Sequence, residues 1–242
     1  MASEFKRTLV TAALPYANGP IHLGHLAGCY LPSDIYVRFK RLKGEEVAFV
    51  CGSDEHGMAI TMKARKEGVT PREIVDRYHV MMRDALADFG IAFDHYSRTS
   101  SDRHKQVASD FFKTLYDKGV FEARQTDQYF DPEAQQFLAD RYIVGTCPRC
   151  SHDSAYGDQC EKCGATLNPT DLINPRSSVS GATDLEERET KHLYLKQSNL
   201  RDDLQAWINS KSDWPVLTTS IANKWLNDGD GLQDRGITRD LD

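Results

Sequence analysis

The chain has 242 residues, a formal net charge of −6, and 40% hydrophobic and 27% charged residues. This composition is that of a globular protein with a packed core, so it excludes a wholly disordered chain. The negative charge excludes a protein whose entire surface binds nucleic acid, although a local basic patch is compatible with it. No apolar run reaches the roughly 20 residues that span a bilayer. Residues 1–10 lack the apolar core of a secretory signal. We therefore expect a cytoplasmic protein that does not interact with membranes.

The first third of the chain alternates between strand and helix patterns. Residues 7–14 are rich in β-formers and predict a buried strand, and turn formers fill residues 15–20. We expect a helix from His22 to about Lys43, with a kink or break at Pro32. Its candidate core positions are Leu23, Leu26, Ile35 and Phe39.

The same alternation continues to about residue 119. We expect strands at 45–51 and 91–97, and helices at 58–67, 71–89 and 101–118, the second of which is capped by Thr70. Strands that alternate with amphipathic helices indicate an α/β fold with a parallel sheet.

The character of the sequence changes near residue 120. Residues 122–180 hold short strand-like pieces, many turn formers and paired cysteines, and a further helix is expected at 199–209. We therefore expect an α/β nucleotide-binding unit over 1–119, an insertion over 120–235, and a return toward the first unit over 236–242.

The segment ALPYANGPIHLGHL is the most informative part of the chain. A helix that begins at His22 presents free N–H groups and the positive end of its dipole, which form an anion site. His22 and His25 are three residues apart, so both side chains lie on one face of the first turn. Gly24 has no side chain, so a flat ring could lie against the backbone. Two imidazole donors at this place could stabilise charge that builds on a phosphate.

This segment resembles the "HIGH" signature of the class I aminoacyl-tRNA synthetases, and in its full length it resembles the methionine-specific family. The resemblance continues through SDEHG at 53–57, four cysteines, SGAT at 180–183 and ITRD at 237–240, in the order of the family. It implies the first half of a doubly wound Rossmann-type parallel sheet, with an inserted zinc-ribbon-like connective-peptide subdomain. It also implies ATP-dependent activation of methionine and its transfer to tRNA(Met).

Residue roles follow from the resemblance. His22 and His25, with Arg239, would be catalytic. ATP, bound with Mg²⁺ as a substrate, would contact Pro15, Asn18, Gly19, His22, Gly24 and His25.

Methionine would contact Ala13, Leu14, Tyr16 and Asp54, with the Asp54 carboxylate on the α-ammonium and the Tyr16 hydroxyl near the sulfur. Arg239 would pair with Asp54 or face the substrate. For His56 we expect a structural role as a helix cap.

The cysteine pairs predict a metal site. Cys147 and Cys150 form one CxxC pair, and Cys160 and Cys163 form another. Four thiolates suit tetrahedral zinc and leave no open coordination position, so one structural Zn²⁺ is expected. Two disulfides, free thiols or iron are the alternatives, and His152 is an outside candidate as a ligand. Metal binding by so small an insertion should be coupled to its folding.

Three other interpretations stay open at this point. The family continues with a KMSKS-type loop, a second half-sheet and an anticodon-binding domain, none of which is found here. We therefore expect a fragment that does not charge tRNA. A different HxGH nucleotidyltransferase shares the phosphate chemistry, and a zinc-ribbon RNA-binding module shares the cysteines. The sequence predicts no oligomeric state.

Overall fold

The structure is a computed structural model, and it describes residues 7–227 and 231–238. Contacts within the chain divide it into two compact units, Met1–Phe111 and Phe112–Asp242. The division falls inside helix α5 (Asp102–Asp117). Within the described ranges, no helix is long and apolar enough to cross a membrane.

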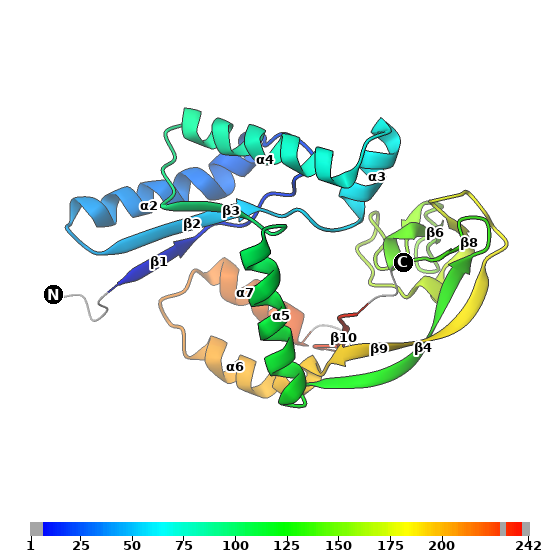
Figure 1. The fold of residues 1–242 in the computed structure, drawn as a ribbon. Helices are drawn as coiled ribbons and strands as arrows, with labels where there is room; N and C mark the ends of the chain where they lie inside the picture. Colours follow the sequence, from blue (N-terminus) through cyan, green and yellow to red (C-terminus); the bar gives the residue numbers. More distant parts are fainter. Residues whose placement is uncertain (1–6, 228–230, 239–242) are drawn as a thin grey trace. The chain divides into compact units, whose positions relative to one another are not determined.

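The first unit is built on a three-stranded parallel sheet in the order β1-β2-β3. Its strands are β1 (Thr8–Thr11), β2 (Val47–Ser53) and β3 (His95–Arg98), and its helices are α1 (Leu23–His25), α2 (Leu31–Leu42), α3 (Met58–Glu67) and α4 (Pro71–Asp88). Figure 1 shows the connections that join the strands, α2 after β1 and α3 with α4 after β2. The expected α/β fold with a parallel sheet is confirmed, and connections of this kind are what parallel strands require.

One apolar cluster holds the crossover helices to the sheet. Val37 of α2, Phe49 of β2 and Leu86 of α4 are buried in it together with Leu26 and Tyr30. Because α2 and α4 share this cluster, they cover the same face of the sheet. Loops follow the carboxyl ends of β1 and β2, which is where ligands bind in open α/β sheets.

The helix after β1 contains the irregularity expected near Pro32. Residues Leu26–Tyr30 form a π-helical turn directly before α2, and Pro32 lies in the first turn of α2. Proline lacks an N–H and its ring clashes with the carbonyl four residues earlier, so a wider turn there relieves the conflict. Residues 23–42 thus run on as one helical segment.

The core positions expected for this segment were mostly wrong. Only Leu26 is buried, whereas Leu23, Ile35 and Phe39 are 77%, 64% and 54% exposed. Asp34 takes the buried position instead, because its carboxylate accepts hydrogen bonds from Arg38 and from the backbone N–H of Ala92. A charged residue whose hydrogen bonds are satisfied can occupy a buried helix position, and the apolar pattern of the sequence does not predict this.

In the residues that the structure describes, the second unit holds two antiparallel sheets, the last residues of α5 and two further α-helices. The four-stranded sheet has the order β10-β9-β4-β5 and the three-stranded sheet the order β7-β6-β8. The strands are β4 (Phe121–Asp131), β5 (Gln136–Phe137), β6 (Ile143–Thr146), β7 (Ala155–Tyr156), β8 (Ile173–Ser177), β9 (Glu186–Leu195) and β10 (Arg235–Gly236). The helices are α6 (Arg201–Asn209) and α7 (Val216–Asn227). Figure 1 shows β4 and β9 as a long ribbon that leads to the small sheet.

Candidate functional site

The candidate site lies where β1 and β2 end. Tyr16 and Asp54 form a parallel bridge beyond these strands, in which Asp54 N–H donates to the Pro15 carbonyl at 2.8 Å and Ala17 N–H donates to the Asp54 carbonyl at 2.8 Å. The bridge holds the PYANG loop beside the SDEHG loop. Predicted site residues that are 38 positions apart in sequence, Tyr16 and Asp54, therefore meet at one edge of the sheet.

His22 and His25 lie together at the start of the helix. Their rings stack with centroids 3.8 Å apart and an interplanar angle of 26°, and both side chains are exposed. His22 caps the helix, because its Nδ1 accepts from Gly24 N–H at 3.1 Å. His25 Nδ1 accepts from His22 N–H at 3.2 Å. The two imidazoles thus form a reciprocal capping box in the manner of Ser and Glu.

This capping arrangement decides the tautomer of each neutral ring. A ring nitrogen that accepts a hydrogen bond carries no proton, so the proton of each neutral imidazole is on Nε2. Both Nε2–H groups are then free of the cap, and both are donors. Gly24 supports the arrangement, because a Cβ there would lie 2.9 Å from the His22 ring.

The other predicted ATP-binding residues are part of the loop before the helix. Pro15 is buried, Asn18 and Gly19 are half-buried, and Asn18 N–H donates to the Tyr16 carbonyl at 2.8 Å. No atom outside the immediate chain lies within 4 Å of a Cβ built on Gly19. The loop is therefore compact at Pro15 and open at Gly19.

Tyr16 is fixed by the residues that follow Asp54. Its hydroxyl donates to the His56 carbonyl at 2.5 Å. Gly57 has φ +113°, and a Cβ on it would lie 2.1 Å from the Tyr16 oxygen. Only glycine allows both the backbone angle and the close approach. Gly57 is also the N-cap of α3 and makes no side-chain cap, so the helix-cap role expected for His56 is wrong. The His56 ring instead contacts the Thr99 carbonyl at 3.3 Å.

The predicted methionine contacts share this edge. Ala13 and Leu14 are exposed at the end of β1, and Asp54 is half-buried. A cavity of about 160 Å³ is lined by residues at the ends of the three strands, Leu14 among them. Arg239 lies outside the described residues.

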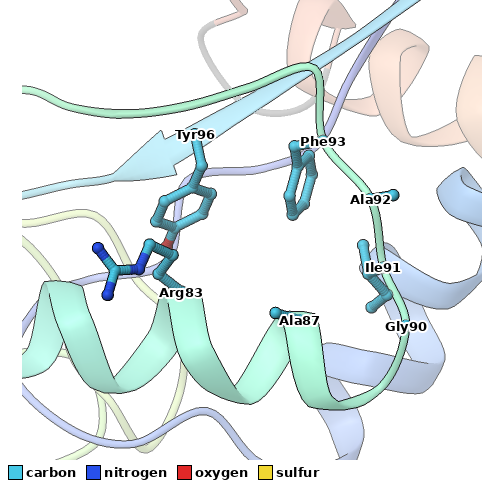
Figure 2. A pocket seen from close by; sticks show the side chains of 7 residues that line it. All are labelled: Arg83, Ala87, Gly90, Ile91, Ala92, Phe93 and Tyr96. Atoms are coloured by element: carbon cyan, nitrogen blue, oxygen red, sulfur yellow. The ribbon is translucent and has the colours of Figure 1, made fainter.

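A larger cavity of about 420 Å³ lies elsewhere in the first unit. Figure 2 shows its lining side chains on α4, on the segment that leads to β3 and, for Tyr96, on β3 itself, with Arg83 and Tyr96 at one end and Ile91 at the other. None of the predicted site residues that the structure describes lines it. Although this cavity is larger, the candidate functional site is therefore the one at the ends of the strands.

Sequence reasoning missed a buried polar cluster behind Asp54. Glu55 is 5% exposed and accepts from Ser53 Oγ at 2.7 Å, from Arg98 Nε at 2.7 Å and from Ser100 Oγ. Burial raises the pKa of Glu55, but these hydrogen bonds and the Arg98 charge outweigh burial, so the pKa is lowered. The sequence signal was a Glu directly after the ligand-loop Asp, together with Arg98 at the end of the next strand.

His79 completes this cluster from α4. Its Nδ1 lies 2.7 Å from Ser53 Oγ, whose proton is given to Glu55, so His79 is the donor. Burial and then the nearby Arg98 charge lower the pKa of His79. The neutral ring is thus favoured beside the ion pair.

The four paired cysteines converge in the second unit. Their sulfur atoms all lie within 4.8 Å of one another, with Cys147–Cys163 at 3.9 Å and Cys150–Cys160 at 3.6 Å. Tetrahedral zinc with Zn–S bonds of about 2.3 Å requires sulfur separations of about 3.8 Å. These distances fit a single tetrahedral ion and are far too long for the disulfide alternative.

Two equivalent turns carry these cysteines. In each, the N–H of the first cysteine donates to the carbonyl five residues later, His152 or Ala165, at 2.8 and 2.9 Å. The residue after the second cysteine is left-handed in each, with φ +56° at Ser151 and +73° at Gly164. Such paired knuckles are the expected scaffold of a four-thiolate site. His152 supplies a carbonyl here, and the cluster consists of the cysteines.

The clustered thiols perturb one another. The Cys163 N–H that faces the sulfur is the main reason that the pKa of Cys160 is lowered to about 6. The His152 N–H lowers the pKa of Cys150, but burial and the other thiols outweigh it and raise that pKa to about 12. The Cys160 thiolate thus forms readily, and the neighbouring thiols oppose ionisation of Cys150. A bound dication compensates for the repulsion between the negative charges.

Comparisons with known proteins show the family of the chain. A family model described as "tRNA synthetases class I (M)" matches residues 8–242. The methionine–tRNA ligase of Parabacteroides distasonis is 56% identical over 243 residues, and that of Flavobacterium psychrophilum is 57% identical over 244. Each alignment covers 100% of this chain and 35% of the relative. The chain thus spans about a third of the length of these curated relatives.

Solved structures share the fold. Mycobacterium tuberculosis methionyl-tRNA synthetase in complex with methionyl-adenylate matches with a TM-score of 0.69 and 21% identity, over 97% of this chain and 41% of that one. The LeuRS of Agrobacterium radiobacter K84, in a ternary complex with tRNA and LeuAMS, matches with a TM-score of 0.64 and 22% identity, over 93% and 25%. The resemblance inferred from the HLGH segment is confirmed, and the chain belongs to the class I tRNA synthetases (M).

Proposed function

We propose that this chain forms the ATP- and methionine-binding part of a methionine–tRNA ligase. The stacked His22–His25 pair is the observation that carries the proposal. Its two Nε2–H donors stand at the start of a helix, at the sheet edge where Tyr16 and Asp54 meet. A helix N-terminus with two further donors suits the phosphates of a nucleotide. We assign methionine as the amino-acid substrate because the relatives are named methionine–tRNA ligases.

The first reaction is the activation of methionine. A carboxylate oxygen of methionine attacks the α-phosphorus of ATP, the bond to the oxygen that bridges the α- and β-phosphates breaks, and pyrophosphate leaves with Mg²⁺. Charge builds on the phosphate oxygens in the transition state, and the His22 and His25 donors stabilise it. Pro15, Asn18, Gly19 and Gly24 line the nucleotide, and no covalent enzyme intermediate is needed. Catalysis rests on positioning and electrostatics.

The amino acid lies beside the histidine pair. Asp54 binds the α-ammonium, and Ala13, Leu14 and Tyr16 contact the thioether side chain. Arg239 pairs with Asp54 or faces the substrate. A half-buried carboxylate beside exposed apolar side chains fits a ligand that has one cationic and one apolar end.

The second reaction transfers methionine to the 3′-terminal ribose of tRNA(Met), with AMP as the leaving group. We assign the ATP-binding unit to residues 1–119, the connective-peptide insertion to 120–235 and the return toward the first unit to 236–242. A cytoplasmic location is part of the proposal, because the reducing cytosol preserves four thiols as metal ligands.

Zinc is the metal that we assign to the cysteine cluster. Cys147, Cys150, Cys160 and Cys163 would hold one Zn²⁺ with all four positions filled, so the ion has a structural role. When bound, it cross-links two turns that have little apolar core of their own. Iron can occupy such a site, so metal analysis must name the ion.

Methionine-dependent exchange between ATP and pyrophosphate tests the function. We expect the full-length gene product to catalyse exchange with methionine, and exchange at least tenfold slower with leucine. Asp54 can bind the α-ammonium of either amino acid, but leucine has no sulfur to contact Tyr16. His25→Ala should lower kcat about a hundredfold. Exchange with a small-molecule acceptor but not with methionine would favour a different HxGH nucleotidyltransferase. Salt-sensitive RNA binding without ATP binding would favour the zinc-ribbon alternative.

A further inference from the structure

The side chain of Glu55 is fully buried, directly after the residue that we assign to the methionine ammonium. A buried carboxylate is costly unless it is paired and hydrogen-bonded. Ser53, Ser100 and Arg98 supply three donors, and the Arg98 charge neutralises it. Such a group is held in one orientation by several bonds at once.

The backbone around Glu55 is bonded to the neighbouring strand end. Glu55 N–H donates to Thr99 Oγ1 at 2.8 Å, and Thr99 N–H donates to the Ser53 carbonyl at 3.1 Å. On its other side, Asp54 is bonded to Pro15 and Ala17 by the bridge described above. The segment that carries Asp54 is therefore braced from both neighbours.

Arg98 connects this brace to the helix layer. Its second nitrogen donates to Asp76 of α4 at 2.5 Å, while the first contacts Glu55. The Arg98 and Glu55 side chains are 21% and 0% exposed, so solvent weakens their ion pair little, whereas Asp76 is 46% exposed and its bond to Arg98 is screened more strongly. The orientation of the loop is thus set by both β3 and α4.

Consecutive residues of an extended segment point to opposite sides. Glu55 points inward to Arg98, and this leaves Asp54 directed away from the core. We propose that the Glu55–Arg98 ion pair is a positioning device that fixes the Asp54 carboxylate for the α-ammonium of the amino acid. Glu55 is fully buried and acts through Asp54, and Arg98 serves as its ion-pair partner. The inference rests on the proposed function.

The test is a double-mutant cycle in the ATP–pyrophosphate exchange of the full-length gene product. Glu55→Gln keeps the size of the side chain and removes its charge. We expect a KM for methionine about tenfold higher, as for other residues that orient a ligand-binding group, with the KM for ATP unchanged. Asp54→Asn should raise the KM for methionine further. In that background, Glu55→Gln should have no additional effect, because nothing is left to position.

Glu46 provides the matched control. It forms an ion pair with Arg7 in which both side chains are well exposed, at 65% and 79%. Glu46→Gln should leave both KM values unchanged. If Glu55→Gln does not fold, Ser100→Ala removes one hydrogen bond to Glu55 and should still raise the KM for methionine about threefold.

The outcomes separate the inference from the function. Wild-type protein without methionine-dependent exchange overturns both. Active wild-type protein with an unchanged KM in Glu55→Gln overturns the positioning role alone. Equal losses for methionine and ATP, or effects of Glu55→Gln and Asp54→Asn that multiply, show a general structural role and also overturn it.

Discussion

Gly57→Ala is the substitution whose effect the structure specifies most closely. Gly57 has φ +113° and ψ 171°, a region that is essentially restricted to glycine. A side chain held there costs about 1–3 kcal/mol. The new Cβ also collides with the Tyr16 oxygen, so the Tyr16–His56 hydrogen bond is lost for about 1 kcal/mol more. We expect the first unit to be destabilised by about 2–4 kcal/mol.

Two further variants separate the causes. Gly68 ends α3 with φ +68° and nothing within 4 Å of a Cβ, so Gly68→Ala should cost about 1 kcal/mol from backbone strain alone. In a Tyr16→Phe background the colliding oxygen is gone, and the next ring atom is 3.3 Å from the Cβ. Gly57→Ala should then cost about 1 kcal/mol less than in the wild type.

Hydrogen exchange measured on peptides that cover β2 and α3 is the suitable assay. The three tryptophans, Trp207, Trp214 and Trp225, all belong to the second unit, so their fluorescence gives an independent control. It should be unchanged in every variant. Equal costs for Gly57→Ala and Gly68→Ala, or the same cost with Phe at position 16, would refute the argument.

Three other predictions follow from single contacts. Cys147→Ser should lower the zinc content and melt the knuckle module, while Cys29→Ser should do neither, and full metal content with unchanged thermal unfolding in Cys147→Ser would contradict this. Hydrogen bonds from Ser198 and Arg124 lower the pKa of Asp234 from 3.8 to about 2, so its contribution to stability is fully present above pH 3.8 and is lost as the pH falls through 2. Asp234→Asn should therefore be less stable than the wild type in urea at pH 7, and the difference should shrink toward zero as the pH falls through 2. At alkaline pH, ¹⁵N spectra of the His22 and His25 rings should show the Nε2–H tautomer, and an Nδ1–H signal from either ring would contradict the capping geometry.

Local signals predicted the helix ends of the first unit better than its strands. The cap expected at Thr70 is confirmed, and α3 and the start of α4 lie where they were expected, whereas the strand expected at 91–97 is β3 at His95–Arg98. These signals are short-range, because a cap is decided by residues within one turn. Helix α7 was not predicted. Its residues Val216, Leu217, Ile221 and Trp225 are exposed, and β-branched residues are common in it, so propensity alone does not favour a helix.

The candidate site was predictable in its residue types but not in its connections. The spacing of His22 and His25 placed both rings on one face, and they stack. No sequence pattern indicated that Tyr16 would bond to His56, or that Glu55 would lie in the core beside Arg98. These contacts join segments some 40 residues apart, and only the pairing of β2 with its neighbours brings them together.

The histidine geometry also limits the chemistry that these two residues can perform. In the neutral state each Nδ1 accepts a backbone hydrogen bond and each Nε2 carries the proton. A ring whose outward nitrogen is already protonated cannot take a proton from a substrate, so general-base catalysis is excluded for the capped, neutral pair. The pair can only donate hydrogen bonds. Such donors stabilise the charge on the phosphate oxygens in a phosphoryl transition state, whereas activation of a nucleophile would require a proton acceptor. Gly24→Ala tests this distinction, because its Cβ forces the His22 ring out of the cap and frees the tautomer. Exchange activity should then fall, and a variant that kept full activity would show that the cap does not matter for catalysis.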